Sequence, residues 1–294
     1  MHKYLRAVGF SKLEERKELQ KLLIDIVVSG KDRAYTSNGE KTLLAQFCRD
    51  FAEDIGIAVC GEFDEDDKFT YDFYFPYLRS HVISSKEDVS IERHAAQESY
   101  AGICDDMKVG VSLIFYLQNI IPYVKAQNSG LLPITGTTLT LTALSIKGNI
   151  MMPIRKTEKD LIQNRKSALS RAYLLDKARQ GNEEAIESLT LGDMDTYTAI
   201  SKRIQKEDVY TLVDNYFMPY GIECDQYSIL AEIMQLREVT NSLTGEEVYI
   251  MTLICNDLIF DMCINKEDLY GEPKIGRRFK GMIWMQGFIN FPDE

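Results

Sequence analysis

The spacing of hydrophobic residues changes twice along this chain. Up to residue 154 most apolar positions alternate with polar ones, which is typical of strands. From there to residue 219 they recur at helical spacing, and near Tyr227 the period of two returns. We therefore predict an α+β fold in three parts. These are a domain with an antiparallel or mixed sheet (1–154), a helical connector (155–219) and a small β-barrel-like module (220–294).

The first part is predicted to begin with two helices. Ser11 and Glu14 match a capping box, and leucines at helical spacing follow until Gly30. A second helix with one apolar stripe is predicted over 43–51. Strands follow at 57–63, 69–75, 89–93, 98–104, 109–117, 137–146 and 150–154, with Pro76 ending the second and 147–149 forming a turn. Residues 119–127 are ambiguous, because Pro122 fits a helix only in its first turn.

The connector and the last part have clearer patterns. Helices are predicted at 157–180, at 183–189 behind the capping residue Asn182, at 195–205 and at 207–217. In the last part, 227–239 predicts a long strand. The strands 248–255 and 258–264 are separated only by Asn256 and Asp257, which predicts a tight hairpin. The final run, 279–291, is apolar on both faces around Trp284, so we expect a strand that is buried on both sides.

Charge and composition exclude several classes of function. The chain has 294 residues and a formal net charge of −11, which disfavours nucleic acid as a partner because phosphate contacts need Lys and Arg. No run approaches the length of a membrane span, and the first ten residues lack the apolar core of a signal peptide. We expect a cytoplasmic protein with no membrane partner.

The residues that could hold a metal are few and scattered. Six cysteines occur without C-x-x-C spacing, and only three histidines accompany them. We interpret the cysteines as buried, reduced thiols. No metal site and no cofactor is predicted.

Three long stretches carry a resemblance to a known family. They are YDFYFPYLRSHVISSKEDVSIERHAAQESYAGICDDMKVGVSLIFYLQN, ESLTLGDMDTYTAISKRIQKEDVYTLVDNYFMPYGIECDQYSIL and LYGEPKIGRRFKGMIWMQGFINF. Together they resemble a bacterial, Clostridia-type family of cytosolic proteins that is classed as a domain of unknown function. The resemblance runs nearly from end to end. It implies a bacterial, intracellular protein and assigns no activity, cofactor or catalytic residue.

Two groups of polar residues are candidate sites. In the final strand, alternation places Arg278, Lys280, Trp284 and Gln286 on one face, which suits recognition of an acidic ligand or partner, and Arg277 precedes this face. This ligand- or partner-binding group comprises Arg277, Arg278, Lys280, Trp284 and Gln286. The second group is a polar cluster in which a carboxylate near a histidine could tune a general base. It comprises Glu92, Arg93, His94, Glu98, Asp105 and Asp106. The alternative for both groups is an ordinary structural or surface role.

Three classes of function remain open. The first is a non-enzymatic binding or scaffold protein that uses its C-terminal β module to engage a protein or a small anionic ligand. The second is an enzyme of unrecognised mechanism, with its site near Glu92 to Asp106. The third, an oligonucleotide-binding-like module, is disfavoured by the acidic charge.

Overall fold

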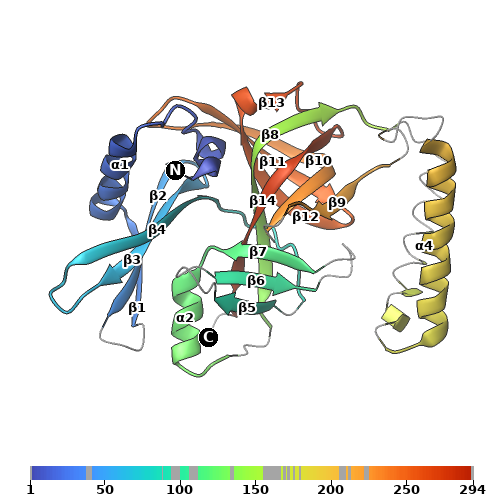
Figure 1. Ribbon diagram of the computed structural model, residues 1–294, viewed down its shortest axis with the longest axis horizontal. Helices are drawn as coiled ribbons and strands as arrows, with labels where there is room; N and C mark the ends of the chain where they lie inside the picture. Colours follow the sequence, from blue (N-terminus) through green and yellow to red (C-terminus); the bar gives the residue numbers. More distant parts are fainter. Residues whose placement is uncertain are drawn as a thin grey trace. The chain divides into compact units, whose positions relative to one another are not determined.

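The computed structural model describes most of the chain and divides it into two units (Figure 1). The residues not described are 1, 38–41, 88, 94–99, 106–111, 133–135, 155–166, 168–169, 171–172, 175, 179, 205–209, 211–212, 222–224 and 293–294. Unit 1 contains Met1–Met151 and Asn215–Glu294, and unit 2 contains Met152–Asp214. The first and last of the three predicted parts thus contribute to the same unit.

Unit 1 begins with a four-stranded antiparallel sheet. Its strands, in spatial order, are β1 (Asp32–Ser37), β2 (Leu43–Ala52), β3 (Ile55–Phe63) and β4 (Phe69–Leu78). The helix α1 (Arg16–Ser29) buries Leu19, Leu23 and Ile26 in the same hydrophobic cluster as this sheet. A short 3-10 helix, η1 (Lys3–Val8), joins that cluster from the N-terminal side.

Two predictions for this region are wrong. Residues 43–51 form the strand β2 and not a helix, because a central strand with apolar neighbours on both faces loses the alternation that marks a strand. The capping box is absent as well: α1 begins at Arg16, and the backbone N–H of Ser11 instead donates to the Glu246 carboxylate at 3.0 Å. The hairpin of β3 and β4 is confirmed.

The strand β4 continues through Pro76 to Leu78, so Pro76 does not end it as predicted. Proline lacks an N–H, yet β4 is an edge strand of its sheet, where a missing donor is tolerated. The proline carbonyl is free to accept a bond from the barrel, and it does so from Gln286 at 2.8 Å.

The second sheet of unit 1 closes on itself as a five-stranded barrel. The barrel strands are β8 (Thr138–Met151), β12 (Leu258–Asn265), β11 (Glu247–Cys255), β10 (Gln226–Thr240) and β14 (Arg278–Asn290). Closure arises because β14 pairs with both β10 and β8, while β8 pairs in parallel with β12. The barrel-like module is therefore confirmed, but one of its strands comes from the first predicted part.

Shorter elements extend this sheet. They are β13 (Leu269–Tyr270) on β8, β9 (Tyr216–Pro219) on β10, and β7 (Leu113–Leu117), β6 (Tyr100–Cys104) and β5 (Val89–Arg93) beyond β14. A 3-10 turn, η2 (Lys266–Asp268), follows β12. The ambiguous segment forms the helix α2 (Ile120–Asn128), with Pro122 in its first turn as the geometry of proline requires.

Two turn predictions have different outcomes. The hairpin at Asn256 and Asp257 is confirmed, and both residues have positive φ, at 49° and 65°, as a tight turn of this length demands. The predicted turn at 147–149 is wrong, because β8 runs straight through it as one strand. Its extra residue is absorbed as a bulge opposite Gly281 and Ile283, so the turn-forming residues bend the strand and do not reverse it.

The final strand is buried on both faces, as predicted, and each face has its own neighbours. Phe279, Ile283 and Met285 belong to the cluster that fills the barrel. Trp284 points outward and joins the cluster formed by the four-stranded sheet, α1 and η1. The barrel wall is therefore the shared layer between two hydrophobic cores.

Unit 2 is described mainly by one helix, α4 (Glu183–Ile204). The two helices predicted at 183–189 and 195–205 are one continuous helix that includes Gly192. Asn182 caps it, since its Oδ1 accepts a bond from the Ala185 N–H at 2.9 Å. The helices predicted at 157–180 and 207–217 lie largely outside the described residues. Among those described, no helix has the length and apolar character to span a bilayer.

Gly287 provides a test of the packing between β14 and β7. A Cβ at this position would lie 2.3 Å from the Phe115 ring, which is fully buried, so we expect Gly287→Ala to lower the free energy of unfolding by about 1–3 kcal/mol. The measurement is chemical denaturation followed by the fluorescence of Trp284, the single tryptophan of the chain. Gly192→Ala, where a Cβ meets nothing within 4 Å, is the control and should leave this transition unchanged. Equal stability of both variants would contradict this packing.

The buried imidazole of His2 makes the stability of the fold depend on pH. Burial beside Lys3 lowers the pKa of His2 from 6.5 to about 4, and its Nδ1 has no hydrogen-bond partner among the described residues. The unfolded chain then binds a proton more readily, so this contribution to stability is complete above pH 6.5 and is lost as the pH falls towards 4. Its size is on the order of 3 kcal/mol at most. His2→Phe should flatten the slope of unfolding free energy between pH 6.5 and 4; an unchanged slope would refute this assignment.

Candidate functional site

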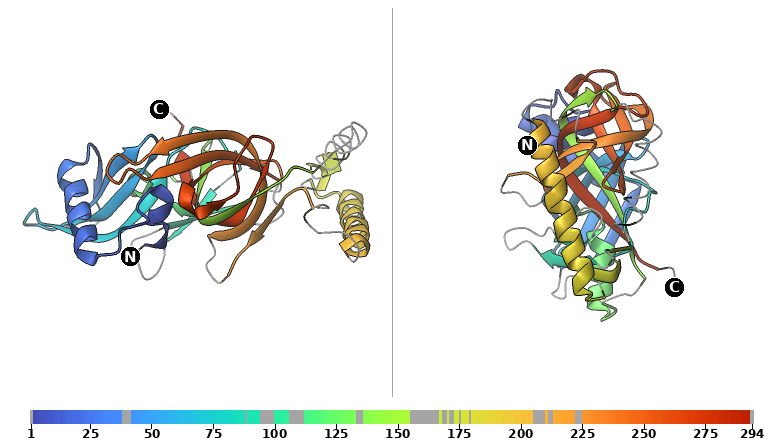
Figure 2. Two further views of the ribbon diagram at one scale, coloured as in Figure 1. Left: turned by 90° about the horizontal axis from the view of Figure 1, so that it is seen from above. Right: turned by 90° about the vertical axis from the view of Figure 1, so that its right-hand side faces the viewer.

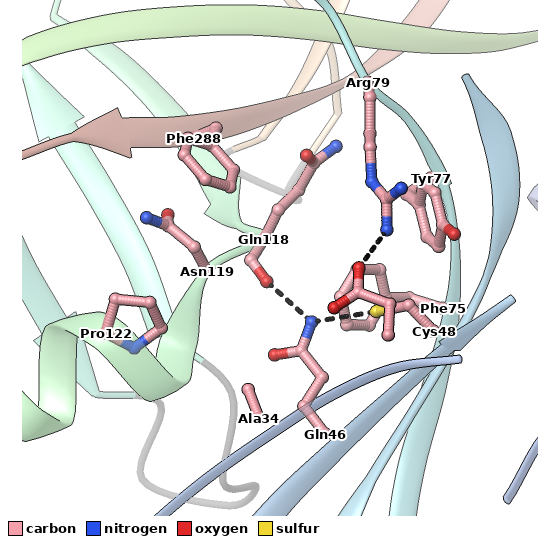
Figure 3. Close-up of a pocket in the computed structure, with 11 residues that line it drawn as sticks. Ala34, Gln46, Cys48, Phe75, Tyr77, Arg79, Gln118, Asn119, Pro122 and Phe288 are labelled. Carbon is pink, nitrogen blue, oxygen red and sulfur yellow. Dashed lines mark hydrogen bonds and ion pairs between the residues drawn. The ribbon is translucent and has the colours of Figure 1, made fainter. Parts of the chain in front are cut away.

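A pocket of about 230 Å³ lies in unit 1 where the four-stranded sheet meets α2 and β14 (Figure 3). We call it the Gln118 pocket. Its lining residues are Asp32, Ala34, Gln46, Cys48, Phe75, Tyr77, Arg79, Gln118, Asn119, Pro122 and Phe288. They come from β1, β2, β4, the segments that follow β4 and β7, the first turn of α2, and β14. An apolar hollow with a few fixed polar groups is the usual form of a small-molecule site.

Arg79 is the basic residue of this pocket, and its guanidinium is already engaged. It contacts the Asp32 carboxylate at 2.5 Å and the Asp50 carboxylate at 3.2 Å, and it stacks over the Tyr77 ring at 4.8 Å. Burial alone would lower the pKa of Arg79, but Tyr77 and Asp50 outweigh it and the net shift is upward. The guanidinium is therefore a permanently charged group that two carboxylates hold in place.

Cys48 is the only thiol among the lining residues, and its environment does not activate it. Burial raises the pKa of Cys48 to about 11, and the Gln46 amide contacts its sulfur at 3.5 Å. Nucleophilic cysteines instead have a lowered pKa, because the thiolate is the reactive form. At neutral pH the Cys48 side chain is thus a protonated, weakly polar part of the wall.

A buried amide network supports the back of the pocket. Gln118 Nε2 lies 3.0 Å from the Leu78 carbonyl, 3.1 Å from Thr142 Oγ1 and 2.7 Å from Gln286 Oε1, and its two N–H groups are shared among these three acceptors. Gln286, which is fully buried, donates in turn to the Pro76 carbonyl. Because backbone carbonyls accept these bonds, they fix which end of each amide points where. The network links β4, β8 and β14 directly behind the pocket.

Two amide oxygens of the pocket accept nothing from the described residues. Gln46 Nε2 donates to the Gln118 carbonyl at 3.1 Å, which leaves Gln46 Oε1 unused. Gln118 Oε1 likewise receives no bond from the described part of the chain. In Figure 3 the Gln118 side chain extends between those of Phe288 and Arg79. Because both glutamines line the pocket, these two oxygens are candidate hydrogen-bond acceptors for a bound molecule.

The site predicted on β14 is spread along the strand. Trp284 and Gln286 are buried, and Trp284 stacks on Tyr4 while its Nε1 donates to Asp225 at 2.6 Å. Arg278 is 6% exposed, whereas the half-buried Arg277 donates to the Glu272 carbonyl at 2.6 Å. Lys280, also half-buried, lies between them and Trp284.

Of these five residues, only Gln286 lies behind the Gln118 pocket. Arg278 and Phe288 are about 33 Å apart along β14 at the usual rise per residue. A binding role for Arg277, Arg278 and Lys280 stays a prediction.

The second predicted cluster lies mostly outside the described residues. His94, Glu98 and Asp106 belong to that part of the chain, and nothing is described of the Arg93 side chain. Glu92 lies exposed on β5, opposite Ala101 of β6. Asp105 accepts a bond from Ser112 at the exposed end of β6. The hypothesis of a general base at this cluster stays a prediction.

The Gln118 pocket is not among the predicted sites because its residues share no sequence motif. Asp32, Gln46, Arg79 and Gln118 lie on separate elements and become neighbours only when the sheet packs against α2 and β14. One weak signal existed: glutamines at Gln46, Gln118 and Gln286 interrupt otherwise apolar runs. Such interruptions in buried strands usually mark hydrogen-bonded groups.

No group of three or more His, Cys, Asp or Glu side chains among the described residues is arranged to hold a metal ion. Cys48, Cys60, Cys104, Cys255 and Cys263 are buried and form no disulfide among the described residues. Burial raises the pKa of Cys60 and Cys263 well above the usual value, and that of Cys255 to about 12.

Comparison with known proteins gives one match. Neither the search of curated proteins nor the search of solved structures returned a significant match. The family model described as "Domain of unknown function, E. rectale Gene description (DUF3881)" matches residues 5–287, which covers nearly the whole chain. The family name points to bacteria, in agreement with the resemblance described above. The chain therefore belongs to this family, a domain of unknown function.

Proposed function

We propose that the protein is a non-enzymatic, cytoplasmic binding protein that holds a small molecule in the Gln118 pocket. The observation that carries this proposal is the pairing of apolar walls with amide oxygens that remain open inside a hollow of about 230 Å³. This volume suits a ligand with a single ring and one polar head group, slightly below the usual range for larger ligands. The C-terminal barrel takes part through Phe288 on the wall and Gln286 behind it.

The chemistry of the pocket supports binding over catalysis. The raised pKa of Cys48 keeps its thiol protonated, and none of the described residues that line the pocket is a histidine that could act as a base. Tyr77 donates its hydroxyl to Asp50 at 2.5 Å, and burial raises its pKa far above the neutral range. Arg79 is held by its two carboxylates. These groups position a ligand, but they do not move its protons.

The cytoplasm as location is part of the proposal. Six cysteines without paired spacing, five of them described as buried thiols, suit a reducing compartment. Because the net charge is −11, we propose no nucleic acid as a partner.

Filling the pocket tests the proposal. Ala34 lines it from β1 and is opposite Gln46 in the strand register, so Ala34→Phe places a ring inside the hollow. We expect at least one of benzamide, benzamidine and benzoate to bind the wild type with a dissociation constant on the order of 1 mM. Saturation-transfer NMR and thermal shift measure this binding, and Ala34→Phe should abolish it.

Two further variants make the result decisive. Phe288→Ala removes an apolar wall that is 41% exposed, so it should weaken binding with little loss of stability. Tyr35→Phe, next to Ala34 on β1 but packed against Phe47 and Phe63, is the matched control and should bind normally. The proposal fails if no probe binds, or if binding persists in both Ala34→Phe and Phe288→Ala.

A further inference from the structure

Most side-chain hydrogen-bond donors of the Gln118 pocket have partners within the protein. Arg79, whose guanidinium has five N–H groups, donates to two carboxylates, and Tyr77 donates to one of them. The Asn119 amide donates to the Ile289 carbonyl at 2.8 Å and accepts from the Ile289 N–H at 3.0 Å. Pro122, in the first turn of α2, has no N–H to offer. A ligand that must accept hydrogen bonds would therefore compete with these internal partners.

Two hydrogen-bond acceptors of the pocket, in contrast, have no partner among the described residues. Gln46 Oε1 and Gln118 Oε1 are open, because the nitrogen of each amide is fixed on a backbone carbonyl and neither side chain can rotate its N–H groups inward without losing that bond. An apolar ligand would displace the water that bonds to these oxygens and would leave them without a hydrogen bond, which costs binding free energy. The pocket is thus complementary to a ligand that donates.

The charge around the pocket points the same way. Asp32 and Asp50 together carry two negative charges against the single positive charge of Arg79. Both carboxylates are partly exposed, with 61% and 47% of their side-chain surface open, and Asp32 lines the pocket itself. An anion would meet this net negative charge and would compete with two carboxylates for one guanidinium. A cation or a neutral molecule meets no such penalty.

We propose that the Gln118 pocket selects a small neutral or positively charged molecule whose N–H groups donate to Gln46 and Gln118, such as a primary amide or an amidine, over an anion of the same shape. This inference rests on the proposed function and specifies its ligand class. It departs from the small anionic ligand expected from the sequence, which was tied to Arg277 and Arg278 at the other end of β14. Ala34, Phe75 and Phe288 provide the walls for a flat apolar body attached to the donor group.

The test compares three probes that share one ring and differ in the head group: benzamide, benzamidine and benzoate. We expect wild-type protein to bind benzamide and benzamidine at least tenfold more tightly than benzoate. The dissociation constants are measured by NMR titration at low ionic strength. Raising the salt concentration should weaken only benzamidine, because its preference includes the charge of Asp32 and Asp50.

A charge variant provides the sharper control. Asp32→Asn removes one exposed carboxylate from Arg79, and an exposed ion pair contributes little to stability, so the fold should persist. In this variant the affinity for benzamidine relative to benzoate should fall at least several-fold.

The possible outcomes distinguish an error in the ligand class from an error in the proposed binding function. If benzoate binds the wild type most tightly and Ala34→Phe abolishes that binding, the pocket binds ligands but the donor-bearing class is wrong. If no probe binds in a way that depends on Ala34, the proposed function falls as well. Equal affinity for all three probes, unaffected by Asp32→Asn, would also overturn the inference.

Discussion

The ladder between β8 and β14 is the interaction on which the rest of this structure depends. Its pairs run from Arg278 opposite Met151 to Asn290 opposite Thr138, and they close the barrel by joining strands that are far apart in the sequence. Without this ladder, β8, β12, β11, β10 and β14 would form an open sheet. Closing it also fixes the outer face of β14, on which Trp284 and Gln286 meet the first sheet. The two hydrophobic cores of unit 1 thus share a wall built from strands that are distant in the sequence.

Two different kinds of contact hold the barrel to the four-stranded sheet. Around Trp284 the contact is apolar and aromatic, with Tyr4, Tyr116 and His2 about 5 Å from the indole ring. Around Gln286 it is polar: the amides of Gln118 and Gln286 bond to the carbonyls of β4. A buried amide network must be fully bonded to be tolerated, and such a network specifies one arrangement of the two layers. The Gln118 pocket lies where this network reaches the edge of the interface.

This origin explains the character of the proposed site. The amides and the guanidinium of the pocket serve the architecture with their donors, since they bond to backbone carbonyls and carboxylates. The amide oxygens of Gln46 and Gln118 then remain available to a ligand. Asp32 and Asp50 add a net negative charge nearby. The specificity we infer is therefore a by-product of how the layers are joined. It also explains why the permanent charge of Arg79 does not by itself make an anion site.

The sequence alone determined the local elements whose patterns depend on local physics. The hairpin at Asn256 and Asp257, the two buried faces of β14, the cap at Asn182 and the α+β class followed from turn chemistry and periodicity. The tertiary structure decided what those rules do not contain. Residues 43–51 became a strand because apolar neighbours cover both of its faces, 147–149 became a bulge because β14 continues beside it, and β8 joined a barrel whose other strands lie far along the chain. The pocket is also decided by the tertiary structure. Gln46, Arg79 and Gln118 belong to no motif in the sequence. Only long-range packing brings their side chains together and gives their N–H groups partners within the protein.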